Sequence, residues 1–408
     1  MSQPTFGEDR PVPRDVVVSG LGPLAAARAH PVAPEAVDPP LTATPGLAAL
    51  FAMSDATGMM QHAIGVIPDR RHGYCLDDNA RALILMNSAG TLQPAEQIRW
   101  SAAYAGFIQY AWNPDRQTFR NFMRYDRSWC EEAGSEDSVG RAMWSLGHTA
   151  ARAPDPSMRH WAKQLFDVAL PGFGEVDSPR ALAFAMLGAH DVLKVEQNHQ
   201  GALDLINRGG VLLSHVLDAS RRPDWAWFEA VLGYDNPRLP QALMLAGHAC
   251  GNKAWIDAGM ETLGWIADRQ TAAEGHFRPV GSETFGRDHD QMPFDQQPLE
   301  AQAAVEAATT AYLLSQDARW VDHAKAAYKW YFGANDRGVV LADLASGRCR
   351  DGVTPRGVNE NCGAESIIAF QLAYVSLIEL LQAAKATVKA SDRFENQNIN
   401  PSGSFAYS

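Results

Sequence analysis

The stretch Asp224-Trp-Ala-Trp-Phe-Glu-Ala-Val-Leu-Gly-Tyr-Asp-Asn-Pro-Arg-Leu-Pro-Gln241 leads into an apolar helical segment. It holds three carboxylates, two indoles, a phenyl ring, a phenol, carboxamides and a guanidinium, which is more chemistry than a connection between helices needs. The segment that follows, Leu239-Pro-Gln-Ala-Leu-Met-Leu-Ala-Gly247, is apolar over much of its circumference, which is typical of a buried helix. A long polar loop that enters a buried helix is the pattern that organises the whole chain.

Helical periodicity begins near Pro45 and continues to about Thr387, and it predicts about twelve helices. Strand-like alternation is nearly absent and is limited to short runs inside connections, at 119–125 and 338–344. The predicted helices span residues 45–62, 77–90, 94–112, 138–152, 157–169, 179–194, 200–219, 237–250, 253–270, 297–315, 318–333 and 363–386.

The connections between these helices alternate in length. Those after the even-numbered helices are short polar turns, such as Gly251-Asn252, whereas those after the odd-numbered helices are longer and rich in Gly, Pro, Trp and acidic residues. Antiparallel helices with every second loop elaborated form six hairpins whose long loops emerge on one face. The sequence therefore predicts an all-α (α/α)6 toroid, with the even-numbered helices inside and the active cleft on the long-loop face.

Three regions follow from this pattern. Residues 1–44 are predicted to be an irregular N-terminal extension, 45–386 the toroid domain, and 387–408 an irregular C-terminal tail. The N-terminus lacks a basic segment followed by an apolar one, and no apolar run is judged long enough to span a bilayer. A cytoplasmic protein is expected.

Composition narrows the partners and cofactors. The 408-residue chain has a formal net charge of −12 and no run of Lys or Arg, so neither nucleic acid nor membrane is expected as a partner. Five cysteines without a CxxC spacing argue against a disulfide framework and against a zinc site. Without a phosphate-binding loop or GxSxG elbow, we expect no cofactor and no metal.

The junctions between long loops and inner helices carry an excess of acidic and amide residues. An Asp or Ser before a helix is ordinarily an N-cap, and a Glu in the first turn complements the helix dipole. One cap satisfies a helix, whereas Asp77-Asp78-Asn79, Glu136-Asp137 and Asp295-Gln296-Gln297 each supply two or three polar groups. The excess predicts a functional cleft.

Carboxylates beside aromatic rings and amides favour carbohydrate acid/base chemistry, because sugars stack on rings and their hydroxyls need donors and acceptors. Glycoside cleavage needs one protonated carboxyl and one carboxylate. The candidates for the general acid are Glu136 and Asp137, and those for the base are Asp295 and Glu229. Further predicted substrate-binding groups are Asp77, Asp78, Asp235 and Glu365, a sugar platform of Trp225, Trp227 and Tyr234, and hydroxyl binders Arg238, Asn236 and Gln296. Core packing of the tryptophans and an ion pair at Arg238 are the structural alternatives.

Four motifs carry a resemblance to known proteins: Tyr74-Cys-Leu-Asp-Asp-Asn-Ala-Arg81, Gly134-Ser-Glu-Asp-Ser-Val-Gly-Arg141, the stretch from Trp225 to Pro240, and Phe294-Asp-Gln-Gln-Pro-Leu-Glu-Ala301. With the helix count, they resemble the six-hairpin glycosidase superfamily, and more narrowly a bacterial family often labelled glycosyltransferase. The resemblance covers roughly residues 45–386 and implies hydrolases, phosphorylases, lyases or related sugar epimerases. A nucleotide-sugar transferase would need a doubly wound α/β domain, which the sequence lacks.

The leading hypothesis is a glycoside hydrolase that acts on short oligosaccharides. A phosphorylase on the same fold would need a cationic clamp, for which Arg278, Arg287 or Arg356 could serve. The resemblance implies that an epimerase would use two histidines, and long-loop candidates are His72, His276 and His289. A carbohydrate-binding protein without catalysis is the alternative from another class.

Overall fold

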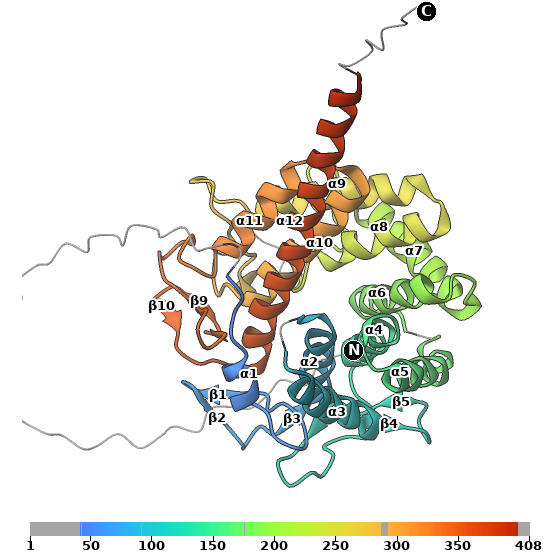
Figure 1. The fold of residues 1–408 in the computed structure, drawn as a ribbon, viewed down its shortest axis with the longest axis vertical. Helices are drawn as coiled ribbons and strands as arrows, with labels where there is room; N and C mark the ends of the chain where they lie inside the picture. The colour runs from blue at the N-terminus through green and yellow to red at the C-terminus, as the bar shows by residue number, and fades with distance from the viewer. Residues whose placement is uncertain (1–40, 42, 91, 175, 287–292, 399–408) are drawn as a thin grey trace, which may run out of the picture. The chain divides into compact units, whose positions relative to one another are not determined.

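Six helices form a closed inner ring in the structure, which is a computed structural model (Figure 1). It describes residues 41, 43–90, 92–174, 176–286 and 293–398, of which 388–398 by backbone only. Each ring helix packs against the next, and the last packs against the first. The ring consists of α2 (Leu76–Ser88), α4 (Glu136–Arg152), α6 (Pro179–Val195), α8 (Arg238–Cys250), α10 (Pro298–Ser315) and α12 (Ala364–Asn398).

The outer helices pack against this ring. α3 contacts α2, α5 contacts α4, α7 contacts α6 and α8, α9 contacts α8, and α11 contacts α10 and α12, while the short α1 lies on α12. Their bounds are α1 (Ala48–Ala52), α3 (Pro94–Ala111), α5 (Pro156–Ala169), α7 (Gln200–Ser220), α9 (Lys253–Arg269) and α11 (Arg319–Lys329). The predicted (α/α)6 toroid, with the even-numbered helices inside, is confirmed.

The strands of the described residues lie in the long loops as five two-stranded antiparallel sheets. One of them joins two loops, because β3 from the α1–α2 loop pairs with β6 from the α3–α4 loop. The pairs are β1 (Ala63–Ile64) with β2 (Ile67–Pro68), β3 (Tyr74–Cys75) with β6 (Phe122–Met123), β4 (Trp112–Asn113) with β5 (Thr118–Phe119), β7 (Ala342–Asp343) with β8 (Arg348–Cys349), and β9 (Gly352–Thr354) with β10 (Gly357–Asn359). Short 3₁₀ turns occur at η1 (Pro171–Phe173) and η2 (Ser282–Thr284).

The first predicted helix is wrong in its extent. Helix α1 ends at Ala52 instead of residue 62, because Asp55 Oδ1 accepts the backbone N–H of Thr57 at 2.7 Å and folds the chain into a turn. At the other end, α12 continues to Asn398, past the predicted end at residue 386. The described residues belong to one compact unit, residues 36–408, while the predicted N-terminal extension up to residue 40 lies outside them.

Helix α12 also corrects the expectation about membrane-spanning length. The segment Ala364–Thr387 is long and apolar enough to cross a membrane by length and composition. In the structure 56% of its most apolar window is buried, and the helix packs against α2, α10 and α11. A core helix passes the same composition test, and the contacts account for its apolar character.

All five cysteines are free in the structure. Cys75, Cys349 and Cys362 are buried, whereas Cys130 and Cys250 are exposed.

Helices α4 and α6 approach each other through glycines. A Cβ added to Gly188 would lie 2.3 Å from the backbone oxygen of Met143, and one added to Gly147 would lie 2.1 Å from the oxygen of Gly188. Backbone atoms on both sides cannot move without shifting a whole helix. The spacing of two ring helices therefore depends on the absence of side chains at these positions.

We predict that Gly188→Ala lowers the free energy of unfolding by about 1–3 kcal/mol or more, because the ring must open to admit the methyl group. Gly106→Ala on the outer helix α3 is the matched control, since a Cβ there meets nothing within 4 Å. A better helix former at that position should add up to about 1 kcal/mol. Urea denaturation of both variants measures the difference, and equal stabilities would contradict the close-packing argument.

Candidate functional site

The amino ends of the inner helices meet on the long-loop side of the ring, and arginines join them. Arg81 of α2 contacts Asp77 at 2.9 Å and Glu365 of α12 at 2.9 Å. Arg141 of α4 contacts the same oxygen of Asp77 at 3.0 Å and Asp235 at 2.9 Å. Both guanidinium groups are buried, with 1% of each side chain exposed. The network therefore connects α12, α2, α4 and the loop before α8.

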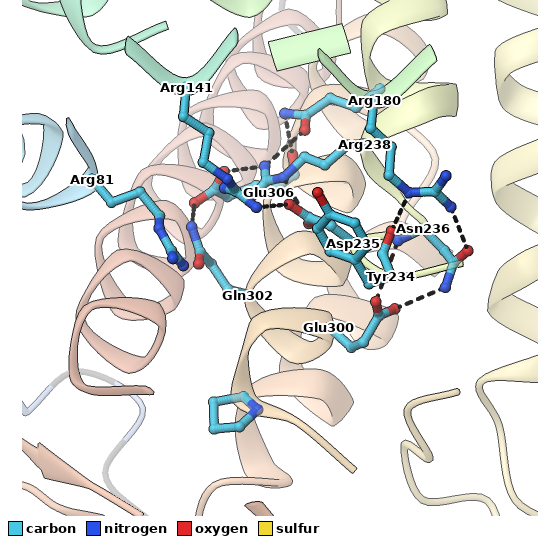
Figure 2. Close-up of polar contacts among 12 residues, drawn as sticks. Arg81, Arg141, Arg180, Tyr234, Asp235, Asn236, Arg238, Glu300, Gln302 and Glu306 are labelled. Atoms are coloured by element: carbon cyan, nitrogen blue, oxygen red, sulfur yellow. Dashed lines mark hydrogen bonds and ion pairs between the residues drawn. The ribbon is translucent and has the colours of Figure 1, made fainter. Parts of the chain in front are cut away.

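Figure 2 shows how the network continues towards α8 and α10, with Arg238 directed at Asp235 and Glu306. Arg238 and Asp235 are fully buried and lie 3.1 Å apart. Gln302 donates to Glu306 at 2.8 Å. Buried charges require such pairing, so Arg238, Asp235 and Glu306 form an ion-pair cluster whose role is structural.

A cleft of about 340 Å³ opens at the mouth between α2 and α12. Its walls come from four long loops and from the first turns of these two helices. The lining residues are Gln61, His62, Cys75, Asp77, Asp78, Arg81, Asn121, Phe122, Gln297, Asp351, Asn359, Gly363, Glu365 and Ser366. Three predicted site residues therefore share this cleft: Asp77, Asp78 and Glu365.

Asp78 has an unusual acidity for a carboxyl group. It is buried, accepts from the Cys75 thiol at 3.0 Å and lies 3.2 Å from Arg81. Burial raises the pKa of Asp78 to about 7, and the neighbouring Asp77 charge adds to the rise against the opposing effect of Arg81. Near neutral pH a substantial fraction of Asp78 is therefore protonated.

Glu300 is a second carboxyl with a raised pKa, and sequence reasoning did not single it out. Burial and repulsion from Asp235 raise its pKa to about 8, although Asn236 and Gln270 donate hydrogen bonds to it. Glu300 lies in the first turn of α10, after Pro298, where an acidic residue is ordinarily explained by its favourable interaction with the helix dipole. Its burial depends on the loop before α8, which the helical pattern does not reveal.

The carboxylates predicted as acid and base lie elsewhere on the mouth, and none of the four is among the residues that line the cleft. Asp137 accepts a short hydrogen bond from Tyr234 and another from Ser178 at 3.1 Å. Glu136 is exposed and accepts the backbone N–H of Ser178 at 3.0 Å. Their assignment as acid stays a prediction.

The two candidate bases, Glu229 and Asp295, differ in their surroundings. Glu229 is ion-paired with Arg180 at 2.6 Å, and 27% of its side chain is exposed. Asp295 is exposed in the loop before α10. The assignment of Glu229 or Asp295 as the base stays a prediction.

The predicted aromatic platform is corrected by burial. Trp227 is fully buried against Phe228 and Trp265, so it offers no face to a ligand. Trp225 is half-buried and packs on Trp265 of the outer helix α9, with its indole N–H donated to the oxygen of Glu229. The alternative of core packing holds for Trp227, while the role of Trp225 stays a prediction. Tyr234 keeps contact with the mouth through Asp137.

The predicted hydroxyl binders are corrected for the same reason. Asn236, Arg238 and Gln296 are fully buried, and each makes hydrogen bonds within the protein, although Nη2 of Arg238 has no hydrogen-bond partner. Asn236 donates to Glu300, and Arg238 to Gln241. Gln296 donates to the Pro293 oxygen and to Asp336, and accepts from Trp330 at 2.9 Å. Asp235 belongs to this buried set, so it pairs arginines instead of contacting a sugar.

Exposed aromatic and imidazole groups at the cleft were missed by sequence reasoning. Phe122 lines the cleft with 36% of the residue exposed, and Tyr125 nearby is 43% exposed and stacks on Tyr74. His62 lines the cleft beside His72, and partial burial followed by repulsion from His72 lowers its pKa. The first two residues lie in the run at 119–125 that was predicted only as a possible strand.

The cations and histidines proposed for the rival reactions are mostly engaged. His276 and Arg278 both contact Asp336, at 2.8 and 2.7 Å. His72 lies 3.6 Å from Asp69. Arg356 is exposed on the α11–α12 loop, while Arg287 and His289 lie outside the described residues.

Comparison with known proteins identifies the fold. No protein-family model matches the sequence, and no curated protein matches it. Among solved structures, the cellobiose 2-epimerase of Bacillus thermoamylovorans has a TM-score of 0.63 at 11% identity and covers 83% of this chain and 96% of its own. A D-mannose isomerase has a TM-score of 0.61 at 11% identity, with 82% and 94% covered.

A third similar structure is an α-1,6-mannanase of glycoside hydrolase family 76 from Salegentibacter, with a TM-score of 0.55 at 11% identity and 82% and 96% covered. That structure is an inactive variant, with two aspartates replaced by alanine, in complex with α-1,6-mannotetrose. The chain has the (α/α)6 toroid fold of these enzymes. The fold implied by the resemblance to six-hairpin glycosidases is thereby confirmed.

We predict that Glu300 makes the protein less stable as pH rises from about 5 to 8. The folded state holds a proton on Glu300 that the unfolded chain has already lost, so unfolding releases a proton. The free energy of unfolding then falls by up to about 1.4 kcal/mol per pH unit. Glu300→Gln mimics the protonated form and should flatten this dependence in urea titrations at several pH values. An unchanged slope would show that Glu300 is ionised in the folded protein.

Proposed function

We propose that the protein is a carbohydrate-active enzyme that hydrolyses glycosidic bonds in the cleft at the start of α2 and α12. The fold supports this proposal, because sugar epimerases, a mannose isomerase and mannanases share it. Fold alone does not define a reaction, so the proposal depends on the chemistry of the cleft.

The proposal is carried by neighbouring carboxyl groups in the cleft, of which one can be protonated while the others are ionised. Asp78, with a pKa of about 7, can hold a proton at neutral pH. Asp77 contacts two guanidinium groups, which stabilise its negative charge. Glu365 lines the same cleft with 42% of its side chain exposed. A protonated carboxyl and an accessible carboxylate in one cleft are the two groups that glycoside cleavage needs.

In the proposed reaction, Asp78 gives its proton to the glycosidic oxygen as the bond from that oxygen to the anomeric carbon breaks. Glu365 takes a proton from the water whose oxygen forms the new bond to the anomeric carbon. Asp77 stabilises positive charge that develops on the sugar ring, while Arg81 and Arg141 keep it in place. The pair Glu136 and Asp137 is the alternative source of the proton.

The charges of the cleft favour a neutral sugar as substrate. Asp77, Asp78, Asp351 and Glu365 line it against one guanidinium, that of Arg81, which three of these carboxylates already contact. Such a cleft repels phosphate. This supports hydrolysis over phosphorolysis.

Epimerisation is the second candidate, and His62 is the observation that favours it. A neutral imidazole can remove a proton from carbon, and the lowered pKa of His62 keeps its ring neutral near pH 7. It would act on a sugar in the same cleft without breaking the glycosidic bond.

We predict that Asp78→Asn lowers turnover by about 10²- to 10⁴-fold, because the amide cannot donate the proton to the leaving oxygen. The measurement is NMR of the anomeric protons during incubation with α- and β-linked gluco-, manno- and galacto-disaccharides. Asp257→Asn, at an exposed ion pair on α9, is the matched control and should keep full activity.

Each outcome of this assay decides between the candidates. Full activity in Asp78→Asn with loss in Asp137→Asn would move the acid role to the Glu136–Asp137 pair. A sugar changed at C2 without cleavage would replace hydrolysis with epimerisation. Circular dichroism of each variant distinguishes lost chemistry from lost fold.

We predict that Phe122→Ala raises KM for oligosaccharides about 3- to 10-fold with little change in kcat, because a sugar face loses its aromatic partner. Tyr110→Ala, which removes a 58% exposed ring on α3 outside the cleft lining, is the control. Equal KM values for the two variants would exclude Phe122 from the substrate site.

A further inference from the structure

A second cavity, of about 350 Å³, lies inside the inner ring and extends from Gln241 and Glu306 to the carboxyl ends of the inner helices. All six inner helices contribute to it, and its lining residues do not overlap with those of the cleft among the described residues. Ser88, His148 and Asp191 lie near the carboxyl ends of α2, α4 and α6. The proposed glycosidase reaction uses none of them.

These three side chains form one hydrogen-bonded chain. Ser88 Oγ lies 2.9 Å from His148 Nε2, and His148 Nδ1 lies 3.1 Å from Asp191 Oδ2. His148 and Asp191 are buried, while Ser88 is half-buried. The order of a hydroxyl, an imidazole and a carboxylate is the order in which a serine nucleophile is activated.

The groups that contact Asp191 favour its ionised form. Burial opposes the charge of Asp191, but the hydrogen bond from His148 and the ion pair with Lys194 outweigh it and lower the pKa of Asp191. Lys194 Nζ lies 2.6 Å from Asp191 Oδ1. An ionised Asp191 accepts the N–H from Nδ1 of His148, which leaves the lone pair of Nε2 facing the Ser88 hydroxyl. The Ile84 carbonyl, 2.9 Å from Ser88 Oγ, is the competing acceptor of the Ser88 hydroxyl proton.

The walls of the cavity define the kind of molecule that fits. Ile84, Leu187, Leu313 and Leu372 supply apolar surface. Arg152 also lines the cavity and is ion-paired with Glu379 at 3.3 Å. Apolar walls suit a short acyl or aryl group, and a guanidinium can stabilise negative charge on oxygen.

We propose that Ser88, His148 and Asp191 hydrolyse small, uncharged carboxylic esters in this second cavity. Ser88 Oγ bonds to the carbonyl carbon as its proton passes to His148 Nε2. The bond from that carbon to the alcohol oxygen then breaks, and His148 returns the proton to the leaving alcohol. Water, deprotonated by His148, attacks the acyl group on Ser88, and the carboxylic acid leaves as the serine hydroxyl is restored.

The test uses the full-length protein with two probes, a fluorophosphonate that labels activated serines and p-nitrophenyl acetate. We expect stoichiometric labelling of Ser88, located by peptide mass spectrometry. Hydrolysis of the ester should fall about 10³-fold or more in both Ser88→Ala and His148→Gln. Ser376→Ala is the matched control, because Ser376 lines the same cavity and bonds to Thr309 instead of a histidine.

An unlabelled wild-type protein, or an adduct on Ser376 in place of Ser88, would overturn the proposal. So would ester hydrolysis that Ser88→Ala leaves unchanged, since Ser88→Ala removes the nucleophile with a minimal change of volume. Asp78→Asn should retain the ester hydrolysis, which separates this site from the cleft. Circular dichroism verifies the fold of each variant.

Discussion

The sharing of Asp77 by two buried arginines is the constraint on which the mouth of the ring depends. One carboxylate oxygen contacts Arg81 at 2.9 Å and Arg141 at 3.0 Å, and the outer contacts of these arginines reach Glu365 and Asp235. Loss of Asp77 would leave Arg81 with Asp78 and Glu365 and Arg141 with Asp235 alone, and breaking a buried ion pair costs about 3–5 kcal/mol. The same contacts that close the ring between α12, α2 and α4 therefore hold the cleft carboxylates in position.

Helix polarity explains why acidic groups gather on this side. The amino ends of the inner helices carry unsatisfied N–H groups and a partial positive charge, which stabilise carboxylates within the first turn. Asp77, Glu136 and Glu300 all occupy first turns, yet their environments differ. Glu136 is exposed to solvent, and Asp77 is ion-paired with arginine. Glu300 is buried, which raises its pKa. One sequence pattern thus yields three kinds of acid, because the loops decide the solvation.

The sequence was sufficient for the fold because helical periodicity and alternating loop lengths are local signals. It also placed Asp77, Asp78 and Glu365 at the mouth, since each begins an inner helix. It did not show that Trp227 and Arg238 are buried, because the same residue types occur in a protein core and in a binding site. The packing of Trp227 on Trp265 and the ion pair of Arg238 with Asp235 place both residues in the core. Phe122 reaches the cleft through pairing of distant loops, β3 with β6. Such long-range pairing leaves no periodic trace in the chain.

The opposite end of the ring has the reverse polarity, and this decides which groups it must carry. Helix carboxyl ends disfavour negative charge, so an ionised Asp191 there needs the contacts with Lys194 and His148 that it makes. A serine nucleophile at the same end would form a negative oxyanion against the helix dipoles. Arg152 and Lys194 are then the groups available to offset that cost, and the strength of any ester hydrolysis depends on how far they do so. The two ends of one ring therefore impose opposite electrostatic conditions, which separates a site built from acids from a site built around a histidine.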